Sequence, residues 1–349
     1  MRPDQKLKIA FLTRYDKSRG SSRFRVYSYI PHLERIGWQC RIIPFPAQIS
    51  MKTKTGFLQK AMSAAFRADV VVLQKLVLRE GLIALLKRVN KNIVFDFDDA
   101  IYTPADSLVD DPKARKRYKI IEKRLHHTLR EVRSIIAGNG YLARYAAQFN
   151  SSVHVLPTSL DIDHYTIKET APGKKPIVLG WIGSRENLLD FQPVKDAIKK
   201  TLKKTGDAAV LKIVSSQSLS LGETPVRFEP WSLEKEKEHL YSFDIGLMPL
   251  KDTERTRGRC AFKAILYMAA GLPVLASPVG AASEVVEHGK TGILAATPSE
   301  WVAGIERLVQ DPQLRSDLGS AGHGIVKEKY SIQANATKLS DILKTAISS

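Results

Sequence analysis

The sequence predicts an α/β protein with two successive domains, each built on a parallel β-sheet. In the first half, short apolar runs alternate with longer amphipathic stretches, which is typical of parallel-sheet α/β units. A second series of the same kind begins at residue 176, after the polar, turn-rich stretch TSLDIDHYTIKETAPGKK at 158–175. We therefore expect an N-terminal domain at 1–163, a linker at 164–175, a C-terminal domain at 176–328, and a final helix at 329–349 that packs back toward the N-terminal domain.

The apolar runs give the expected strands in chain order. They are residues 8–14, 39–45, 69–74, 92–97, 133–139 and 152–157 in the first half, and 176–183, 209–215, 226–230, 244–250, 272–277 and 291–296 in the second. Their length and their content of Val, Ile and Leu suit strands that are buried on both faces. Two helices are also expected: 21–37, with a serine at its start and a glycine at its end, and 331–347, which begins with serine and has helical apolar spacing.

The composition is that of an ordinary globular protein with a strongly basic first half. The 349 residues are 44% hydrophobic and carry a net charge of +18. Residues 1–170 hold 30 lysines and arginines against 16 acids, so +14 of that charge lies there. Such a half attracts nucleic acid, an anionic membrane or an anionic substrate. Cys40 and Cys260 form no disulfide or zinc pattern, and no signal peptide or membrane span is recognisable, so we expect a cytoplasmic protein, soluble or peripheral.

The stretch RGRCAFKAILYMAAGLPVLAS at 257–277 predicts an anion-binding site. Arg257, Arg259 and Lys263 lie at the expected start of an apolar helix. Backbone N–H groups already give that end of a helix partial positive charge, so three cations are unfavourable there unless an anion binds. A phosphate group suits these donors, and a solvated basic face is the alternative.

The order of motifs resembles a known family. From DIGLMPL at 244–250, through 257–277 and PVGAASEVVEHGKTGIL at 278–294, to LVQDPQLRSDLGSAG at 308–322, the chain resembles the donor-binding domain of GT-B glycosyltransferases of family 4. The motifs GSSRFRVYSYIPHLERIGW at 20–38, DFDDAIY at 96–102 and NGYLARY at 139–145 resemble a subgroup of the same family. The resemblance implies the GT-B fold, in which two Rossmann-like α/β domains face a central cleft that holds the site.

The resemblance also implies that the second domain binds a nucleotide-sugar diphosphate without a metal ion. Phosphate would be held by Arg257, Lys263 and Arg185, and the backbone would approach the donor closely at Gly183, Ser184 and Gly258. Glu284 would bind near the ribose or the sugar, and Arg259 and Tyr267 complete the expected donor-binding residues. Many relatives have two glutamates in the helix of residues 257–277, with seven residues between them. Gly258 and Leu266 stand at those positions here, so the identity of the donor stays open.

The motif DFDDAIY places Asp96, Asp98 and Asp99 at the end of the expected strand 92–97. Burying carboxylates is costly unless they have partners, which favours a functional site over simple helix capping. Relatives commonly have a His-Asp pair here that contacts the transferred sugar. Asp98 would replace the histidine and Asp99 would match the aspartate, so both are expected to be catalytic, together with Arg257 and Lys263. The expected acceptor-binding residues are Ser22, Arg23 and Arg25.

These features predict a retaining, metal-independent hexosyltransferase that needs no cofactor besides its nucleotide-sugar substrate. The acceptor would be a saccharide or a lipid-linked saccharide in cell-surface polysaccharide or glycoconjugate synthesis. The basic first half would lie on the inner face of the plasma membrane, with Lys52, Lys54, Lys60 and Arg67 of the stretch 51–68 on the lipid around Phe57, Leu58, Met62 and Phe66. Packing of that helix on the sheet is the alternative.

Three other interpretations stay open. Asp96 and Asp98 have the Asp-x-Asp spacing of haloacid dehalogenase-type phosphohydrolases, which depend on magnesium. The run SSRFRVYSY at 21–29 could stack bases and bind phosphates of a nucleic acid, although no nucleic-acid partner is expected. A sugar-nucleotide epimerase of GT-B architecture would consume a nucleotide sugar without an acceptor.

Overall fold

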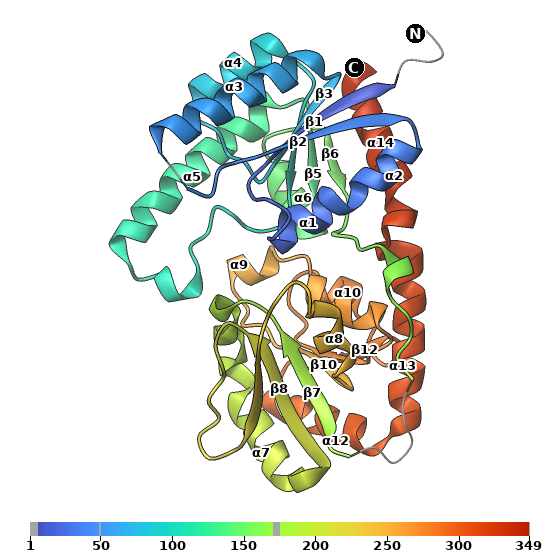
Figure 1. Ribbon diagram of the computed structural model, residues 1–349. Coiled ribbons are helices and arrows are strands. Elements are labelled where there is room, and N and C mark those ends of the chain that lie inside the picture. Colours follow the sequence, from blue (N-terminus) through green and yellow to red (C-terminus); the bar gives the residue numbers. More distant parts are fainter. Residues whose placement is uncertain (1–5, 49, 170–174, 349) are drawn as a thin grey trace. The chain divides into compact units, whose positions relative to one another are not determined.

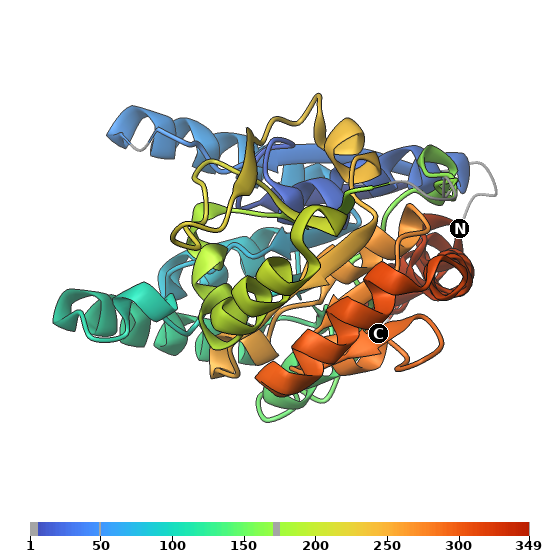
Figure 2. The same ribbon diagram turned by 90° about the horizontal axis from the view of Figure 1, so that it is seen from below.

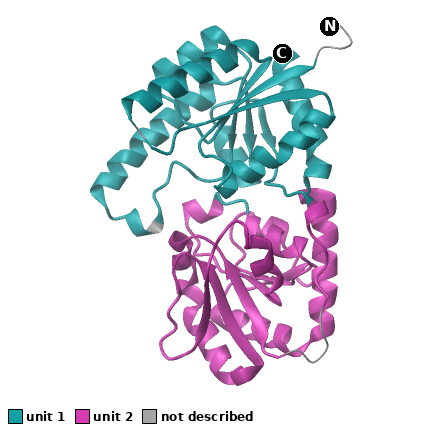
Figure 3. Cartoon of the chain, in the orientation of Figure 1, with its two compact units in different colours: residues 1–161, 258–260, 331–349 teal, residues 162–257, 261–330 magenta. Residues whose placement is uncertain are grey.

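The chain divides into two compact units, each with its own sheet. The computed structural model, drawn in Figure 1, describes residues 6–48, 50–169 and 175–348. Unit 1 comprises residues 1–161, 258–260 and 331–349, and unit 2 comprises residues 162–257 and 261–330 (Figure 3). The chain thus returns to unit 1 twice after leaving it.

Among the described residues, unit 1 has a six-stranded parallel sheet with the order β2-β1-β3-β4-β5-β6. The strands are β1 (Leu7–Thr13), β2 (Trp38–Pro44), β3 (Val70–Gln74), β4 (Ile93–Phe97), β5 (Ser134–Ala137) and β6 (Val153–Val155). β3 and β4 are buried along their whole length. Helices cover both faces of the sheet, and this is why these strands are unbroken apolar runs in the sequence.

Two layers of helices enclose this sheet. α3 (Met51–Arg67), α4 (Glu80–Val89), α5 (Pro112–Glu131) and α6 (Gly140–Ala146) pack in one core layer, which includes Phe57, Leu86 and Leu125. The opposite layer includes Val26, Leu33 and Leu343 and is formed by η1 (Tyr27–Tyr29), α2 (Ile30–Arg35) and α14 (Ile332–Ser348). The helix α5 extends beyond the sheet (Figure 1, Figure 2). The short helix η2 (Asp106–Leu108) precedes α5.

The helix expected at 21–37 is broken into three pieces. α1 (Gly20–Arg25) ends before Val26, whose φ of −129° and ψ of −65° are not helical, and η1 and α2 follow. The expected serine cap, Ser21, is wrong, because the N-cap residue is Arg19 and the Ser21 hydroxyl instead donates to Asp98 Oδ1 at 2.8 Å. The expected closing glycine is present: Gly37 follows α2 with a φ of +96°.

α14 belongs to unit 1. Trp38 Nε1 of β2 donates to Ser340 Oγ at 2.9 Å, and the buried face of α14 packs in the same core layer as Ile9 and Phe11. The serine expected at its start caps it, since Ser331 Oγ accepts a hydrogen bond from the Ala334 N–H at 3.1 Å.

Unit 2 has a second six-stranded parallel sheet within the described part of the chain, with the order β12-β11-β10-β7-β8-β9. The strands are β7 (Ile177–Ile182), β8 (Ala209–Ser215), β9 (Val226–Pro230), β10 (Ile245–Met248), β11 (Val274–Ala276) and β12 (Gly292–Leu294). The helical segments are η3 (Ile162–His164), η4 (Arg185–Val194), α7 (Lys195–Thr205), η5 (Gly206–Ala208), α8 (Glu236–Tyr241), α9 (Glu254–Arg257), α10 (Phe262–Ala269), α11 (Ala282–Val285), α12 (Pro298–Gln310), α13 (Pro312–Ile325) and the π-helical η6 (Val326–Tyr330). The predicted α/β fold class is confirmed.

The boundaries of unit 2 differ from those expected. The unit begins at Ile162, before the expected linker at 164–175, and it ends at Tyr330 rather than at 328. Lys168 Nζ lies 2.7 Å from Asp244 Oδ1, and Tyr241 Oη donates to Thr166 O at 2.8 Å. The first part of the expected linker is therefore bonded to unit 2, whereas residues 170–174 lie outside the described residues. No described helix is both long and apolar enough to cross a lipid bilayer.

Candidate functional site

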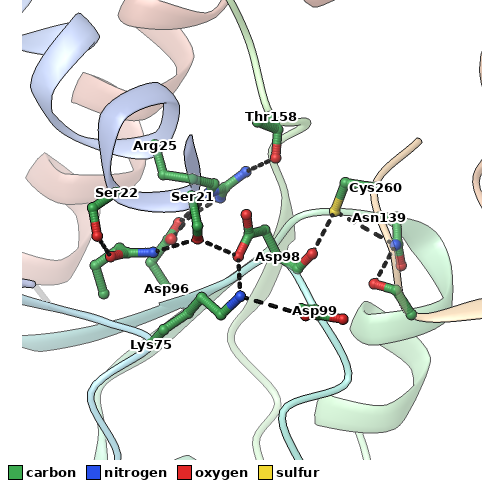
Figure 4. Close-up of polar contacts among 12 residues, drawn as sticks. Ser21, Ser22, Arg25, Lys75, Asp96, Asp98, Asp99, Asn139, Thr158 and Cys260 are labelled. Atoms are coloured by element: carbon green, nitrogen blue, oxygen red, sulfur yellow. Dashed lines mark hydrogen bonds and ion pairs between the residues drawn. The ribbon is translucent and has the colours of Figure 1, made fainter. Parts of the chain in front are cut away.

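Buried charged side chains gather at the carboxyl ends of β3 and β4 in unit 1 (Figure 4). This strand-end cluster consists of Arg25, Lys75, Asp96, Asp98 and Asp99. Parallel strands present their carboxyl ends at one edge of a sheet, where open α/β sheets bind ligands. The expected catalytic residues Asp98 and Asp99 therefore lie at a suitable edge.

Asp96 points toward Arg25 of α1 and is paired with it (Figure 4). The guanidinium donates through Nε to Asp96 Oδ1 at 2.9 Å, through Nη2 to Asp96 Oδ2, and through Nη1 to Leu156 O at 2.7 Å. Both side chains are almost fully buried. A bidentate pair of this kind compensates two buried charges. Because a protein cation occupies the Asp96 carboxylate, the geometry does not favour Asp96 as the nucleophile of a phosphohydrolase.

Asp98 is held by a lysine and a serine. Lys75 Nζ lies 3.0 Å from Asp98 Oδ1, and Ser21 Oγ donates to the same oxygen at 2.8 Å. Both side chains of the ion pair are 11% exposed. Burial alone would raise the pKa of Asp98, but the charges of Lys75 and Arg25 and the two hydrogen bonds outweigh it and lower that pKa. Asp98 is therefore a carboxylate at neutral pH.

Lys75 is the residue of this cluster that the sequence analysis missed. It follows β3 with a φ of +52°, a left-handed conformation that is uncommon for residues other than glycine. Its Nζ also lies 3.6 Å from Asp99 Oδ2. Burial would lower the pKa of Lys75, but Asp98 and Asp99 raise it above its ordinary value. One signal could have found Lys75: it is a lysine directly after the apolar run at 69–74, which neighbours the strand of the DFDD motif.

Two of the expected acceptor-binding residues lie at the strand-end cluster. Ser22 and Arg25 are buried and bonded within unit 1, to Gln74 and Asp96. Arg23 is half-buried, with its guanidinium 4.4 Å from the centre of the Phe24 ring. The prediction that Arg25 faces the acceptor is therefore corrected, because most of its donors are already used inside the protein.

Residues 258–260 form a short segment of unit 1 beside the strand-end cluster. Asn139 Nδ2 donates to the carbonyls of Gly258 and Arg259 at 3.1 Å each, and Cys260 Sγ donates to Asp98 O at 3.2 Å. A Cβ at Gly258 would lie 2.6 Å from Ala100 Cβ, so only glycine fits there without a shift. The expected reason for Gly258, close approach to a donor, is thus replaced by close approach to Ala100. Burial also raises the pKa of the Cys260 thiol.

In unit 2, two of the expected donor-binding residues come together at the carboxyl end of β7. Lys263 lies in the first turn of α10, which contains no acidic residue. A Cβ at Gly183 would lie 2.8 Å from Lys263 Cε and 2.7 Å from Trp181 Cη2, and Lys263 Nζ is 5.2 Å from the centre of the Trp181 ring. The lysine side chain thus lies across Gly183 and against the indole.

Two polar groups at this edge have no hydrogen-bond partner within the part of the chain that the structure describes. They are the indole N–H of Trp181 and the hydroxyl of Ser215, which ends the neighbouring strand β8. Both atoms are buried. Buried polar groups are normally hydrogen-bonded, so two such groups near the carboxyl ends of β7 and β8 suit an edge that takes a polar ligand.

Arg257 does not start the apolar helix, which corrects the expected arrangement of cations. α9 ends at Arg257, and Ala261, with a φ of +50°, precedes α10. The Arg257 guanidinium donates to the Asp252 carboxylate at 2.6 and 3.0 Å, and both side chains are about half exposed. Arg257, Arg259 and Lys263 therefore do not share one helix terminus.

The other expected donor-binding residues divide into exposed and buried ones. Ser184 and Arg185 are exposed where η4 begins, and Glu284 is exposed on α11. Tyr267, in contrast, is fully buried in unit 2, where its hydroxyl accepts a hydrogen bond from the Ile182 N–H at 3.1 Å. The expected donor contact of Tyr267 is thus corrected to a packing role. Within the described ranges, no three His, Cys, Asp or Glu side chains are grouped so that they could hold a metal ion.

Comparison with known proteins links unit 2 to one family. Residues 176–311 match the family model described as glycosyl transferases group 1. TuaH of Bacillus subtilis, named as a glycosyltransferase of teichuronic acid biosynthesis, is 23% identical over 212 residues, which are 55% of this chain and 53% of TuaH. The chain thus spans about half the length of this curated relative.

Solved structures agree over nearly the whole chain. A sucrose-phosphate synthase from Thermosynechococcus elongatus has a TM-score of 0.73 at 15% identity, covering 97% of this chain and 99% of its own. HepE of Anabaena, solved with UDP and glucose, has a TM-score of 0.68 at 16% identity, covering 97% and 100%. These likenesses establish the GT-B fold, and the family match over residues 176–311 confirms the predicted resemblance to GT-B glycosyltransferases. Membership of family 4 stays a prediction.

Proposed function

We propose that this protein is a retaining, metal-independent glycosyltransferase of family 4, which moves a hexose from a nucleotide sugar to a saccharide or a lipid-linked saccharide. The observation that carries the proposal lies in unit 2. Lys263 extends across Gly183 at the carboxyl end of β7, inside the segment that matches the group 1 glycosyltransferases. An ammonium group in the first turn of a helix that has no acidic residue in that turn suits a diphosphate.

The chain's residues would act by positioning and by charge. Lys263 and the backbone at Gly183 and Ser184 would hold the diphosphate. Glu284 would bind near the ribose or the sugar. The remaining proposed donor ligands are the neighbouring arginines in the sequence, Arg185, Arg257 and Arg259. The acceptor hydroxyl would attack the anomeric carbon on the face that the diphosphate leaves, and a departing phosphate oxygen would take its proton. Stabilising the leaving charge is the main catalytic contribution in such a step. Asp98 and Asp99 would contact the transferred sugar.

The first experiment identifies the donor. Thermal unfolding is measured with UDP, GDP, CMP and dTDP and with their sugars, because a ligand at a hundred times its dissociation constant stabilises by about 2.7 kcal/mol. Transfer with the best donor is then compared in Lys263→Ala and in Lys290→Ala, which removes an exposed lysine that is paired with Glu287. We expect Lys263→Ala to slow transfer by roughly a hundredfold and the control to be normal. Donor consumption without an acceptor would point instead to an epimerase, and equal rates in both variants would remove the phosphate role of Lys263.

The proposal includes no cofactor or metal ion besides the nucleotide sugar. The expected behaviour is full activity after treatment with EDTA. Strict dependence on magnesium would contradict this part of the proposal and would favour chemistry at the carboxylates of the DFDD motif.

We further propose that unit 1 attaches to the inner face of an anionic membrane and that the product belongs to cell-surface polysaccharide or glycoconjugate synthesis. The likeness to TuaH supports the second part. The helix α3 supports the first. Phe57 and Met62 pack on the sheet, as the alternative interpretation expected, but Phe66 is 77% exposed, and Lys60 and Arg67 of the same helix are exposed as well. An exposed aromatic side chain beside basic residues suits a lipid surface.

Vesicle sedimentation tests this attachment. We expect the protein to bind vesicles of phosphatidylglycerol, to be released by salt, and to bind more weakly as Phe66→Ser or Lys60→Glu. Lys344→Glu on α14 is the control for the charge change. Equal binding to neutral phosphatidylcholine, or no binding to anionic vesicles at low salt, would contradict attachment to an anionic membrane. The basic charge of unit 1 would then be better explained by an anionic acceptor in solution.

A further inference from the structure

A basic pocket lies at the end of the unit 1 sheet opposite to the strand-end cluster. It has a volume of about 420 Å³ and is lined by Lys87, Arg88, Lys91, Glu131 and Arg133. Lys87 and Arg88 are in the last turn of α4, Lys91 precedes β4, Glu131 ends α5 and Arg133 directly precedes β5. Since β4 has five residues, the pocket is separated from Asp98 by roughly 17 Å of strand.

The charges in this pocket are not balanced by the protein. Lys87 Nζ lies 2.6 Å from Glu131 Oε2, so the one acidic residue of the lining is paired with one of its four basic residues. No described residue accepts a hydrogen bond from the side chains of Arg88, Lys91 and Arg133 or forms an ion pair with them. Three cations therefore line one pocket without an anionic partner.

Arg133 is the most informative of the three. Its Nε is buried and has no hydrogen-bond partner among the described residues. Its backbone N–H donates to Ile93 O at 2.8 Å, which fixes the start of its side chain between two strands. Buried donors in native proteins nearly always have a partner. A bound anion would satisfy this N–H, and a guanidinium can present two donors to one phosphate.

The preference of helix termini for particular charges explains only part of the pocket. Basic residues are favoured in the last turn of a helix, because carbonyl groups leave negative partial charge there. This accounts for Lys87 and Arg88 on α4. Lys91 and Arg133 lie just past the ends of α4 and α5, where the same preference weakens, and it does not account for the buried Arg133 Nε without a partner. These two residues lie in the loops between α4 and β4 and between α5 and β5, so two separate loops each contribute a cation to the pocket.

We infer that this pocket binds a compact anion with two phosphate groups, at a site separate from the proposed donor site. Three cations without partners exceed what a single phosphate needs, and a volume of about 420 Å³ admits a larger ligand than one phosphate ion. The two phosphate groups could belong to a free molecule or to a lipid headgroup. The inference concerns unit 1 alone and does not depend on the proposed transfer reaction.

Calorimetric titration of the full chain with inorganic pyrophosphate, without divalent ions and at low salt, tests the inference. We expect binding that weakens as salt is added. The double variant Arg88→Ala/Lys91→Ala should bind roughly a hundredfold more weakly, about tenfold for each cation removed. Both side chains are exposed, so the variant should fold. Arg133→Lys keeps the charge but loses the Nε donor, and it should weaken binding by a smaller factor.

Two controls separate this site from general attraction and from the donor site. Lys116→Ala/Lys119→Ala removes the same charge from exposed positions of α5, with Lys119 roughly 18 Å of helix away from Glu131, and should bind normally. Lys263→Ala should also keep the site. No binding, equal weakening in the α5 control, or loss of all binding in Lys263→Ala alone would each overturn the inference.

Sedimentation with cardiolipin vesicles, whose headgroup carries two phosphates, then distinguishes the sources. If Arg88→Ala/Lys91→Ala binds pyrophosphate weakly and also no longer binds these vesicles, the ligand is a lipid headgroup. If it binds pyrophosphate weakly but binds the vesicles like the unaltered protein, the ligand is a free anion. Either result supports a diphosphate site in the pocket.

Discussion

Replacing Lys75 by methionine should destabilise unit 1 in a way that depends on pH. The Lys75 ammonium lies 3.0 Å from Asp98 Oδ1, and both side chains are 11% exposed. At an effective dielectric constant of about 20, the attraction over that distance is roughly 5 kcal/mol, and breaking buried pairs costs about 3–5 kcal/mol in practice. We expect Lys75→Met to lower the free energy of unfolding by about 3 kcal/mol at pH 7. The positive φ adds little to the difference, because neither residue is glycine.

The dependence on pH follows from Asp98. In the unaltered protein its folded pKa is lowered, so its contribution is present above the ordinary pKa of about 3.9 and is lost as pH falls through the folded pKa. Without Lys75, only the charge of Arg25 and the Ser21 hydrogen bond still oppose the effect of burial, so we expect the folded pKa of Asp98 to rise. A carboxyl group with a raised folded pKa destabilises increasingly as pH rises above its unfolded pKa. The deficit of Lys75→Met should therefore be larger at pH 7 than at pH 4.5.

Urea unfolding at the two pH values measures the free energy of unfolding of each variant. Pulsed hydrogen exchange with peptide mass spectrometry measures the stability of unit 1 separately from that of unit 2. Lys87→Met is a matched control: the Lys87–Glu131 distance is 2.6 Å, but the side chains are 38% and 37% exposed, and exposed pairs contribute about 0–1 kcal/mol. The double variant Lys75→Met/Asp98→Asn should recover part of the loss. Equal losses in Lys75→Met and Lys87→Met, or a loss that does not change with pH, would refute the reasoning.

Three further predictions concern transfer and folding. Asp98→Asn should impair transfer more than nucleotide binding, since Asp98 is proposed to lie at the sugar, and a nucleotide titration beside a rate measurement checks this; loss of nucleotide binding would place Asp98 elsewhere. Gly258→Ala should destabilise unit 1 by about 1–3 kcal/mol, because its Cβ would lie 2.6 Å from Ala100 Cβ, and it should raise hydrogen exchange in residues 96–100; unchanged exchange would show that Ala100 can move. Tyr267→Phe should lower thermal stability by the value of one hydrogen bond, about 1 kcal/mol, and leave the affinity for the donor unchanged; a weaker donor affinity would restore the predicted donor contact.

The strands could be predicted closely because the sheet imposes a simple pattern. The expected strands 69–74 and 92–97 correspond to Val70–Gln74 and Ile93–Phe97, which are buried on both faces and contain apolar residues almost throughout. The helix expected at 21–37 was harder to predict. Its residues have good helical spacing, but Ser22 bonds to Gln74, 52 positions away, and the backbone leaves the helix at Val26. Local pattern does not contain such a long-range contact.

The same limit applies to the strand-end cluster. The DFDD motif predicts where Asp98 and Asp99 lie, because they directly follow a recognisable strand. It does not predict their partner. Lys75 comes from the neighbouring strand, and its position depends on the strand order and on a left-handed backbone. Residues with positive φ other than glycine carry no reliable sequence signal, so the pairing becomes visible only in the structure.

The cations at 257–263 have a different explanation from the one their spacing suggests. They do not crowd one helix terminus: Arg257 ends α9 and is paired with Asp252, and only Lys263 lies in the first turn of α10. The residues between them are held by Asn139 and by the Asp98 carbonyl. Asp98 therefore binds Lys75 through its side chain and Cys260 through its backbone.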